Sequence, residues 1–142
     1  MTLILDASMA LSWLLKRKDA SEAAQSGLAL DVIRASGAIV PALWYPEVAN
    51  TLLLAERQRV IAADETGSFL ASLSFWPIVQ DSVLPALCQP QIIHIGRVYR
   101  LTAYDATYLE LAMRHAAVLA TFDRKLADAA RAAGVRVFGD AA

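Results

Sequence analysis

The stretch Thr2–Ser8 reads TLILDAS: a short run of leucine and isoleucine ends at Asp6, and small residues follow at once. Similar short apolar runs recur along the chain and alternate with longer segments of helical periodicity. Short apolar runs of this kind are typical of parallel strands that are buried on both faces. We therefore predict an α/β fold, with a central parallel sheet of about five strands flanked by helices.

The individual elements follow from the same pattern. We predict strands at 2–5, 38–40, 76–79, 118–120 and 135–138. We predict helices at 8–16, 46–59, 104–116 and 123–133. Pro46 suits the first position of its helix, and Gly134 is a typical helix stop. The stretch 81–100 is predicted to be mainly helical with a break near Pro90.

Composition narrows the class of protein. The length of 142 residues fits a single domain, 1–142, with a sizeable core. Hydrophobic residues make up 57% of the chain, yet no charge-free run reaches the length of about 18 residues that a membrane-spanning helix needs. No positive charge precedes the first apolar run, as it would in a signal peptide. We expect a cytoplasmic protein without a membrane partner, whose surplus apolar surface contacts a partner or a second copy.

Cysteine and charge exclude further classes. Cys88 is the only cysteine, so the chain has neither a disulfide framework nor a thiolate metal site. His94 and His115 fall in no zinc-ligand spacing. The formal net charge is -1, so nucleic-acid binding would need a local basic patch. The sequence also lacks the phosphate-binding P-loop, the dinucleotide fingerprint and the serine nucleophile elbow.

Four carboxylates fall at strand ends or helix starts. Asp6 and Asp123 closely follow predicted strands, and Glu47 and Asp105 lie in the first turns of predicted helices. In open α/β sheets, ligand sites form beyond the carboxyl ends of the strands. We therefore expect a parallel sheet to gather these four acids at one edge.

Each acid also has a purely structural explanation. Asp6 and Asp123 have the positions of helix N-caps, and Glu47 gains from the positive end of the helix dipole. Thr102 and Asp105 have the spacing of a capping box. Taken one at a time, these structural roles are the better explanation for each residue.

Taken together, the acids favour a bound cation. Asp105 shares a helical face with Tyr108, Leu109 and Ala112. Glu47 shares one with Asn50, Thr51 and Leu54. A carboxylate on or beside such a face is costly unless it is paired or binds a cation, and these faces contain no basic residue. Carboxylates with Ser8, Asn50 and Thr121 nearby are hard oxygen donors, which favour Mg²⁺ or Mn²⁺.

Four segments resemble, in order, the motifs of PIN-domain ribonucleases, and within them the VapC-type toxins of type II toxin–antitoxin pairs. They are ILDASMALSWLL (4–15), PEVANTLL (46–53), LTAYDATYLELA (101–112) and LATFDRKLADAARAAGV (119–135). The middle of the chain, 64–97, carries no motif of the family. The resemblance implies that substrate and partner choice vary there.

The resemblance also implies a function. The chain would be a Mg²⁺- or Mn²⁺-dependent endoribonuclease that hydrolyses RNA phosphodiester bonds with metal-activated water. Its catalytic, metal-binding set would be Asp6, Glu47, Asp105 and Asp123, oriented by Ser8, Asn50 and Thr121. A cognate small antitoxin protein and a homodimer are the implied partners.

Basic residues near the acids are candidates for RNA binding. Arg124 and Lys125 directly follow Asp123, and we expect them to contact RNA. Other basic residues have the positions of solvated helix ends and are interpreted as such: Lys16, Arg17 and Lys18, which the prediction places at the end of the first helix, and Arg97 and Arg100.

Two alternatives stay open at this point. A catalytically silent PIN-fold interaction module would keep the fold without cutting RNA, although such a module has no need for mutually repelling carboxylates. A phosphotransfer domain with Asp6 as nucleophile is the other, but Ala7 and Ser8 follow Asp6 where the common D-x-D motif requires a second aspartate.

Overall fold

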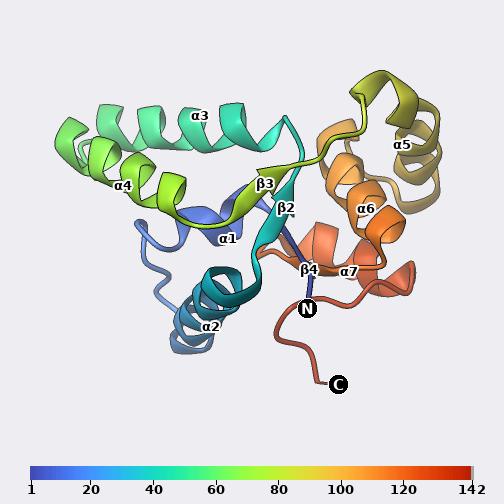
Figure 1. Cartoon of the computed structure of the whole chain (residues 1–142), viewed down its shortest axis with the longest axis horizontal. Helices are drawn as coiled ribbons and strands as arrows, with labels where there is room; N and C mark the ends of the chain where they lie inside the picture. The colour runs from blue at the N-terminus through green and yellow to red at the C-terminus, as the bar shows by residue number, and fades with distance from the viewer. Residues whose placement is uncertain (142) are drawn as a thin grey trace.

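A parallel sheet lies at the centre of the computed structural model, which describes residues 1–141 (Figure 1). Its four strands run in the order β3-β2-β1-β4. They are β1 (Leu3–Leu5), β2 (Ala38–Val40), β3 (Ile78–Gln80) and β4 (Val118–Ala120). All three pairings are parallel, so the carboxyl ends of the strands meet at one edge of the sheet.

Helices connect and cover these strands. They are α1 (Ala7–Leu11), α2 (Ala20–Ser36), α3 (Trp44–Arg57), α4 (Ala63–Phe75), α5 (Pro85–Tyr99), α6 (Ala103–His115) and α7 (Arg124–Ala132). The alternation confirms the predicted α/β class with a central parallel sheet. None of the helices in residues 1–141 is both long and apolar enough to cross a membrane.

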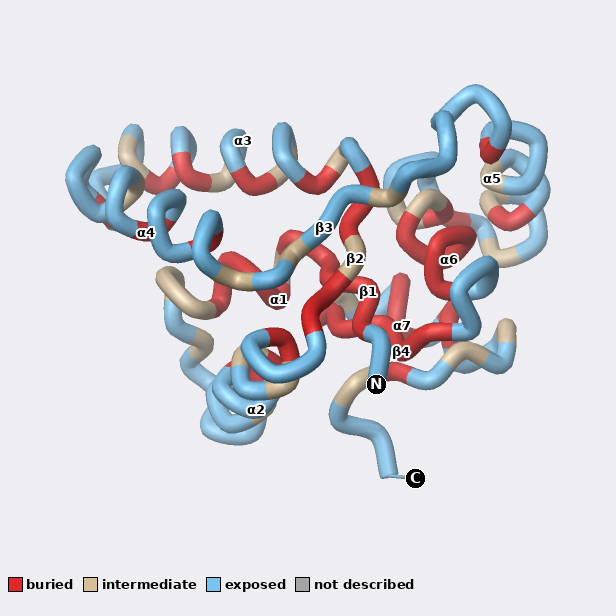
Figure 2. The backbone as a smooth tube through the Cα atoms, viewed as in Figure 1, coloured by how far each residue is buried: buried red, intermediate tan, exposed pale blue. Residues whose placement is uncertain are grey.

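The core forms around β1 and the neighbouring edge strand β4. Every residue of β1 and β4 is buried, as Figure 2 shows at the middle of the molecule. Helix α6 packs against both strands and buries Ala106, Leu109 and Ala112. The outer strand β3 is mostly exposed. Burial on both faces explains why β1 and β4 consist of continuous apolar runs.

The predicted fifth strand at 135–138 is wrong. Val137 forms a single parallel bridge with Leu119 of β4, supported by the bonds Leu119 N–H to Arg136 O at 2.9 Å and Phe138 N–H to Leu119 O at 2.8 Å. The chain then turns away, because Gly139 takes a φ of 98° and Asp140 N–H donates back to Val137 O at 3.1 Å. The apolar run is therefore docked on the sheet edge but is too short to extend the sheet.

The first predicted helix is shorter than expected. The helix at 8–16 is wrong beyond Leu11, because the Ser12 hydroxyl bonds to Met9 O and to the Ser26 hydroxyl, and Trp13 Nε1–H donates to Ser26 O at 2.9 Å. These bonds hold the chain against α2 instead of continuing the helix. Lys16, Arg17 and Lys18 therefore lie in the α1–α2 connection, and not at a helix end as predicted.

Proline marks two further corrections. No break occurs at Pro90, which lies inside the continuous helix α5. The carbonyl of Ala86, which loses its donor to the proline, belongs to an exposed residue and remains open to water. Pro46 is not the first residue of α3, which begins two residues earlier at Trp44. It still falls in the first turn, where no intrahelical N–H bond is required of it.

Candidate active site

The four predicted acids line one pocket. Asp6 follows β1 directly, and its N–H donates to Ala120 O of β4 at 3.0 Å. Glu47 and Asp105 lie in the first turns of α3 and α6, and Asp123 immediately precedes α7. The pocket has a volume of about 420 Å³ and is lined by Asp6, Ala7, Ser8, Leu11, Ser12, Leu15, Arg17, Glu47, Asn50, Thr51, Asp105 and Asp123. The parallel topology thus brings together residues from both halves of the sequence.

Asp6 is the most buried of the four acids, with 7% of its surface exposed. Its Oδ2 accepts hydrogen bonds from the hydroxyls of Ser8 and Thr121, both at 2.6 Å. The same two hydroxyl oxygens accept the N–H groups of Phe122, at 2.9 Å, and Asp123, at 3.0 Å. Two neutral side chains therefore fix Asp6 to the loop after β4 and leave Oδ1 without a side-chain donor.

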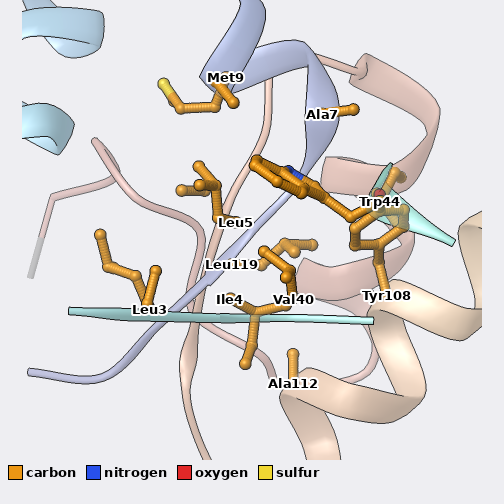
Figure 3. Packing of buried hydrophobic residues seen from close by; sticks show 14 of the residues in the cluster. Leu3, Ile4, Leu5, Ala7, Met9, Val40, Trp44, Tyr108, Ala112 and Leu119 are labelled. Carbon is orange, nitrogen blue, oxygen red and sulfur yellow. The ribbon is translucent and has the colours of Figure 1, made fainter. Parts of the chain in front are cut away.

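Glu47 is held from the other side of the pocket. The hydroxyl of Tyr108 donates to Glu47 Oε1 at 2.5 Å, and the tyrosine is completely buried. Figure 3 draws its ring in the packed core with Trp44 and Ala112. The sequence places Tyr108 one helical turn after Asp105 on the same face, but that spacing alone does not reveal its contact with Glu47.

Helix capping accounts for some of the acids. Asp123 caps α7 by accepting the Leu126 N–H at 3.0 Å. Thr102 accepts the Asp105 N–H at 3.2 Å, but Asp105 returns no bond, so the predicted capping box is only half formed. Asp6 makes no side-chain cap bond to α1. Capping therefore explains the position of Asp123 but does not explain the carboxylates of Asp6 and Asp105.

The site concentrates negative charge. Burial, and after it the charge of Asp123, raises the pKa of Asp6 despite the bonds from Ser8 and Thr121. Burial and the neighbouring acids also raise the pKa values of Glu47 and Asp105. Within residues 1–141, no Lys or Arg donates to any of the four carboxylates, although the charge of Lys125 partly offsets the effect on Asp105.

This donor set fits a hydrated Mg²⁺ or Mn²⁺. The described residues 1–141 contain no ready-made cage of three or more His, Cys, Asp or Glu side chains. Mg²⁺ normally keeps several of its waters and takes only one or two carboxylates. Asp6 and Asp123 each use one oxygen for a neutral protein donor and keep the other free, and Asp105 accepts no side-chain or backbone bond among the described residues. Free carboxylate oxygens without a basic partner are what such an ion requires.

The remaining predicted residues lie at different depths. Asn50 is exposed at the pocket rim, whereas Thr121 is buried behind Asp6. Arg124 and Lys125 are exposed and do not line the pocket. Arg17, interpreted from sequence as a solvated helix end, does line it. The shortened α1 explains this difference, since a chain that leaves the helix at Leu11 carries Arg17 back over the site.

Arg17 is also fixed in place. Its Nη2 donates to Glu22 Oε2 at 3.1 Å, and its guanidinium carbon lies 4.7 Å from the centre of the Phe122 ring. Phe122 belongs to the loop that holds Asp6 through Ser8. No local sequence signal distinguishes Arg17 from Lys16 and Lys18.

The PIN domain family model matches residues 3–132. This chain belongs to the PIN domain family. Its fold is similar to that of PAE2754 from Pyrobaculum aerophilum, with a TM-score of 0.63 and 19% identity, covering 91% of this chain and 87% of that one. It is also similar to the crystal structure of FitAcB from Neisseria gonorrhoeae, with a TM-score of 0.64 and 18% identity, covering 98% and 97%. No curated protein sequence matches significantly. The family match confirms the resemblance to PIN domains, and the two structures support the fold.

Proposed function

We propose that this PIN domain is a Mg²⁺- or Mn²⁺-dependent endoribonuclease and the VapC-type toxin of a type II toxin–antitoxin pair. The observation that carries the proposal is the convergence of Asp6, Glu47, Asp105 and Asp123 on one pocket, with no basic residue of the described part of the chain bonded to any of them. Members of the PIN family are typically nucleases, and hydrolysis of a phosphodiester is the chemistry that such a pocket supports best.

We assign each pocket side chain a role from its position in the site. Asp6, Asp105 and Asp123 would hold the ion directly, and Glu47 would hold it through a bound water. The ion would supply a water of lowered pKa and positive charge for the phosphate. Ser8 and Thr121 orient Asp6 through their hydrogen bonds to its Oδ2. Tyr108 occupies Oε1 of Glu47, so Oε2 would be the oxygen that faces the ion's water and accepts its proton.

The RNA backbone and this acidic pocket are both negatively charged, so basic residues near the pocket are needed to bind RNA. Arg17 lines the pocket and is fixed by Glu22 and Phe122, so it is placed to contact a phosphate. Arg124 and Lys125 extend the positive charge beyond the pocket, next to Asp123. Asn50 at the rim offers an amide for orientation.

A protein partner and a second copy would cover the exposed apolar side chains. Phe75 at the end of α4 is 86% exposed, and Leu87 on α5 is 72% exposed. Single exposed apolar residues are common, but both helices carry several, including Leu70 on α4 and Ile93 and Val98 on α5. We assign this surface to the cognate small antitoxin and to homodimer formation.

Cleavage of structured RNA with and without Mg²⁺ or Mn²⁺ tests the proposal. Asp6→Asn and Asp105→Asn are each expected to lower the cleavage rate by more than the roughly 10–100-fold that loss of an outer partner of a metal ligand costs. Asp31→Asn, an exposed acid on α2 outside the pocket, is the matched control and should cleave normally. Cleavage that survives chelation, or that persists in both pocket variants, contradicts the metal mechanism.

The same experiment separates the catalytically silent PIN-fold module from the enzyme. A silent module would bind a partner but cleave none of a broad set of transfer, ribosomal and messenger RNAs. It would also gain nothing from Mn²⁺, so the absence of both cleavage and metal binding would favour it.

A further inference from the structure

Tyr108 occupies a place in the site that its burial alone does not explain. It lies on α6, one turn after Asp105, and its hydroxyl reaches Glu47 on α3. The bond therefore joins side chains of the two helices that contribute Asp105 and Glu47 to the pocket. The tyrosine is fully buried, whereas Glu47 is partly exposed and lines the pocket.

The geometry fixes one end of a flexible side chain. A glutamate has three rotatable bonds, and ordering its side chain costs conformational entropy. The ring of Tyr108 is locked by its packing in the core, so its hydroxyl is a rigid donor. A bond from this donor to Oε1 leaves Oε2 as the oxygen available to the pocket.

The arrangement repeats what Ser8 and Thr121 do for Asp6. In both cases neutral hydroxyls bond to one carboxylate oxygen and leave the other free. The two cases differ in where the hydroxyl donors lie. The donors to Asp6 lie on α1 and in the loop after β4, whereas the donor to Glu47 lies on the core side of α6.

We propose that Tyr108 is a positioning residue, which holds the Glu47 carboxylate in the orientation that the metal site and its water require. This inference rests on the proposed function. Its direct consequence is that the Tyr108 hydroxyl contributes to divalent-ion affinity only through Glu47. Loss of an outer partner of a metal ligand typically weakens metal binding by about 10–100-fold, and we expect about 10-fold here.

A double-mutant cycle in Mn²⁺ binding tests this. Mn²⁺ binding would be measured by the loss of the free-ion electron paramagnetic resonance signal, without RNA, for wild type, Tyr108→Phe, Glu47→Ala and the double variant. Tyr108→Phe retains the ring, so thermal unfolding should show an intact fold. We expect it to weaken binding by about 10-fold in the wild-type background and by less than about 2-fold in the Glu47→Ala background.

Tyr104→Phe is the matched control. It removes the same hydroxyl from the same helix, but Tyr104 is 63% exposed and does not line the pocket. Its Mn²⁺ affinity should equal that of wild type.

The outcomes distinguish the inference from the proposed function. If wild type binds Mn²⁺ and Tyr108→Phe binds it equally well, the positioning role is overturned and the metal-dependent function stands. An equal loss with and without Glu47 also overturns it, because Tyr108 would then act by another route. If wild type binds no Mn²⁺, the proposed function and the inference fall together.

Discussion

Two clusters of acids in this molecule are stabilised in opposite ways, and helix α6 contributes to both. At its start, Asp105 faces the pocket with no bonded cation among the described residues. Further along, Glu110 is buried, and the more exposed Arg114 donates to its two oxygens from Nε and Nη2 at 2.8 and 3.0 Å. Arg114 also forms a two-point bond with Asp81, at 3.0 and 2.6 Å.

The two environments move the pKa values of their carboxyls in opposite directions. The hydrogen bonds from Arg114 hold the pKa of Asp81 below its usual value. Burial and the charges of Asp123 and Asp6 raise that of Asp105. The partner of Glu110 and Asp81 is an arginine, whereas the side-chain partners of Asp6 and Glu47 are neutral hydroxyls. Among the described residues, the lack of a basic side chain bonded to the pocket acids is therefore a property of the site and not of the whole fold.

Breaking the charge-balanced cluster should give the largest effect on stability. Arg114→Ala leaves Glu110 buried without a partner and is expected to lower the free energy of unfolding by about 3 kcal/mol. That value lies at the lower end for buried pairs, because 28% of the Arg114 side chain is exposed. Denaturant unfolding measures the loss, and Mn²⁺ affinity should stay unchanged.

A paired replacement controls for this first prediction. Arg114→Met with Glu110→Gln removes both charges and is expected to recover part of the loss, since an apolar or neutral substitute for a buried ion pair is often nearly neutral. Destabilisation of less than about 1 kcal/mol by Arg114→Ala would show that this cluster is no more than a surface salt bridge. The contrast with the pocket would then disappear.

Removing a charge from the pocket should raise the free energy of unfolding, whereas breaking the Arg114 cluster should lower it. Asp6→Asn keeps an acceptor oxygen for Ser8 and Thr121 but removes a buried charge. We expect it to stabilise the metal-free protein at neutral pH by about 1–2 kcal/mol, as substitutions that relieve a functional site often do. Because the folded pKa of Asp6 lies above its ordinary value of 3.8, the folded state holds this proton more tightly than the unfolded chain does. Ionisation of Asp6 therefore costs stability as pH rises from 3.8 towards the folded pKa.

Thermal unfolding as a function of pH measures whether Asp6→Asn is more or less stable than wild type. The stability advantage of Asp6→Asn over wild type should be absent below pH 3.8 and should grow as pH rises above it. At neutral pH, Mn²⁺ should raise the melting temperature of wild type and leave that of the variant nearly unchanged. A variant that unfolds, or is less stable at every pH, would assign Asp6 a structural role.

The sequence was sufficient to predict that the four acids lie together, because their positions depend on local rules. Asp6 and Asp123 follow apolar runs, Glu47 and Asp105 fall in first turns, and a parallel sheet turns all strand ends to one edge. The strand at 135–138 failed because the turn at Gly139, directly after it, allows only one bridge to β4, although three of its four residues are apolar.

Two helices and two site residues escaped prediction for related reasons. Helix α2 buries only Ser26, Ala29 and Ile33 among its 17 residues, and α4 buries only Phe69 and Leu73, so neither has a strong apolar stripe. The role of Tyr108 depends on a contact 61 positions away in the chain. Arg17 depends on where α1 ends, which the Ser12 and Ser26 hydroxyls decide.

Substitution of Arg17 should have the smallest effect, a modest loss of RNA affinity. It tests whether an arginine beside the pocket acids differs in role from Arg114, which is bonded to acids. Unlike Arg114, Arg17 lies next to the acids without bonding to any of them, so its guanidinium remains available to a phosphate. Arg17→Ala, measured in the cleavage-deficient Asp6→Asn background, should weaken RNA binding about 5-fold, close to 1 kcal/mol. The dependence of log affinity on log salt should decrease by about 0.7–0.9, the loss of one phosphate contact. Lys18→Ala, an exposed neighbour outside the pocket, is the matched control. If the two variants weaken binding equally, Arg17 contributes only to the general charge of the connection, and the pocket must attract RNA through Arg124 and Lys125 instead.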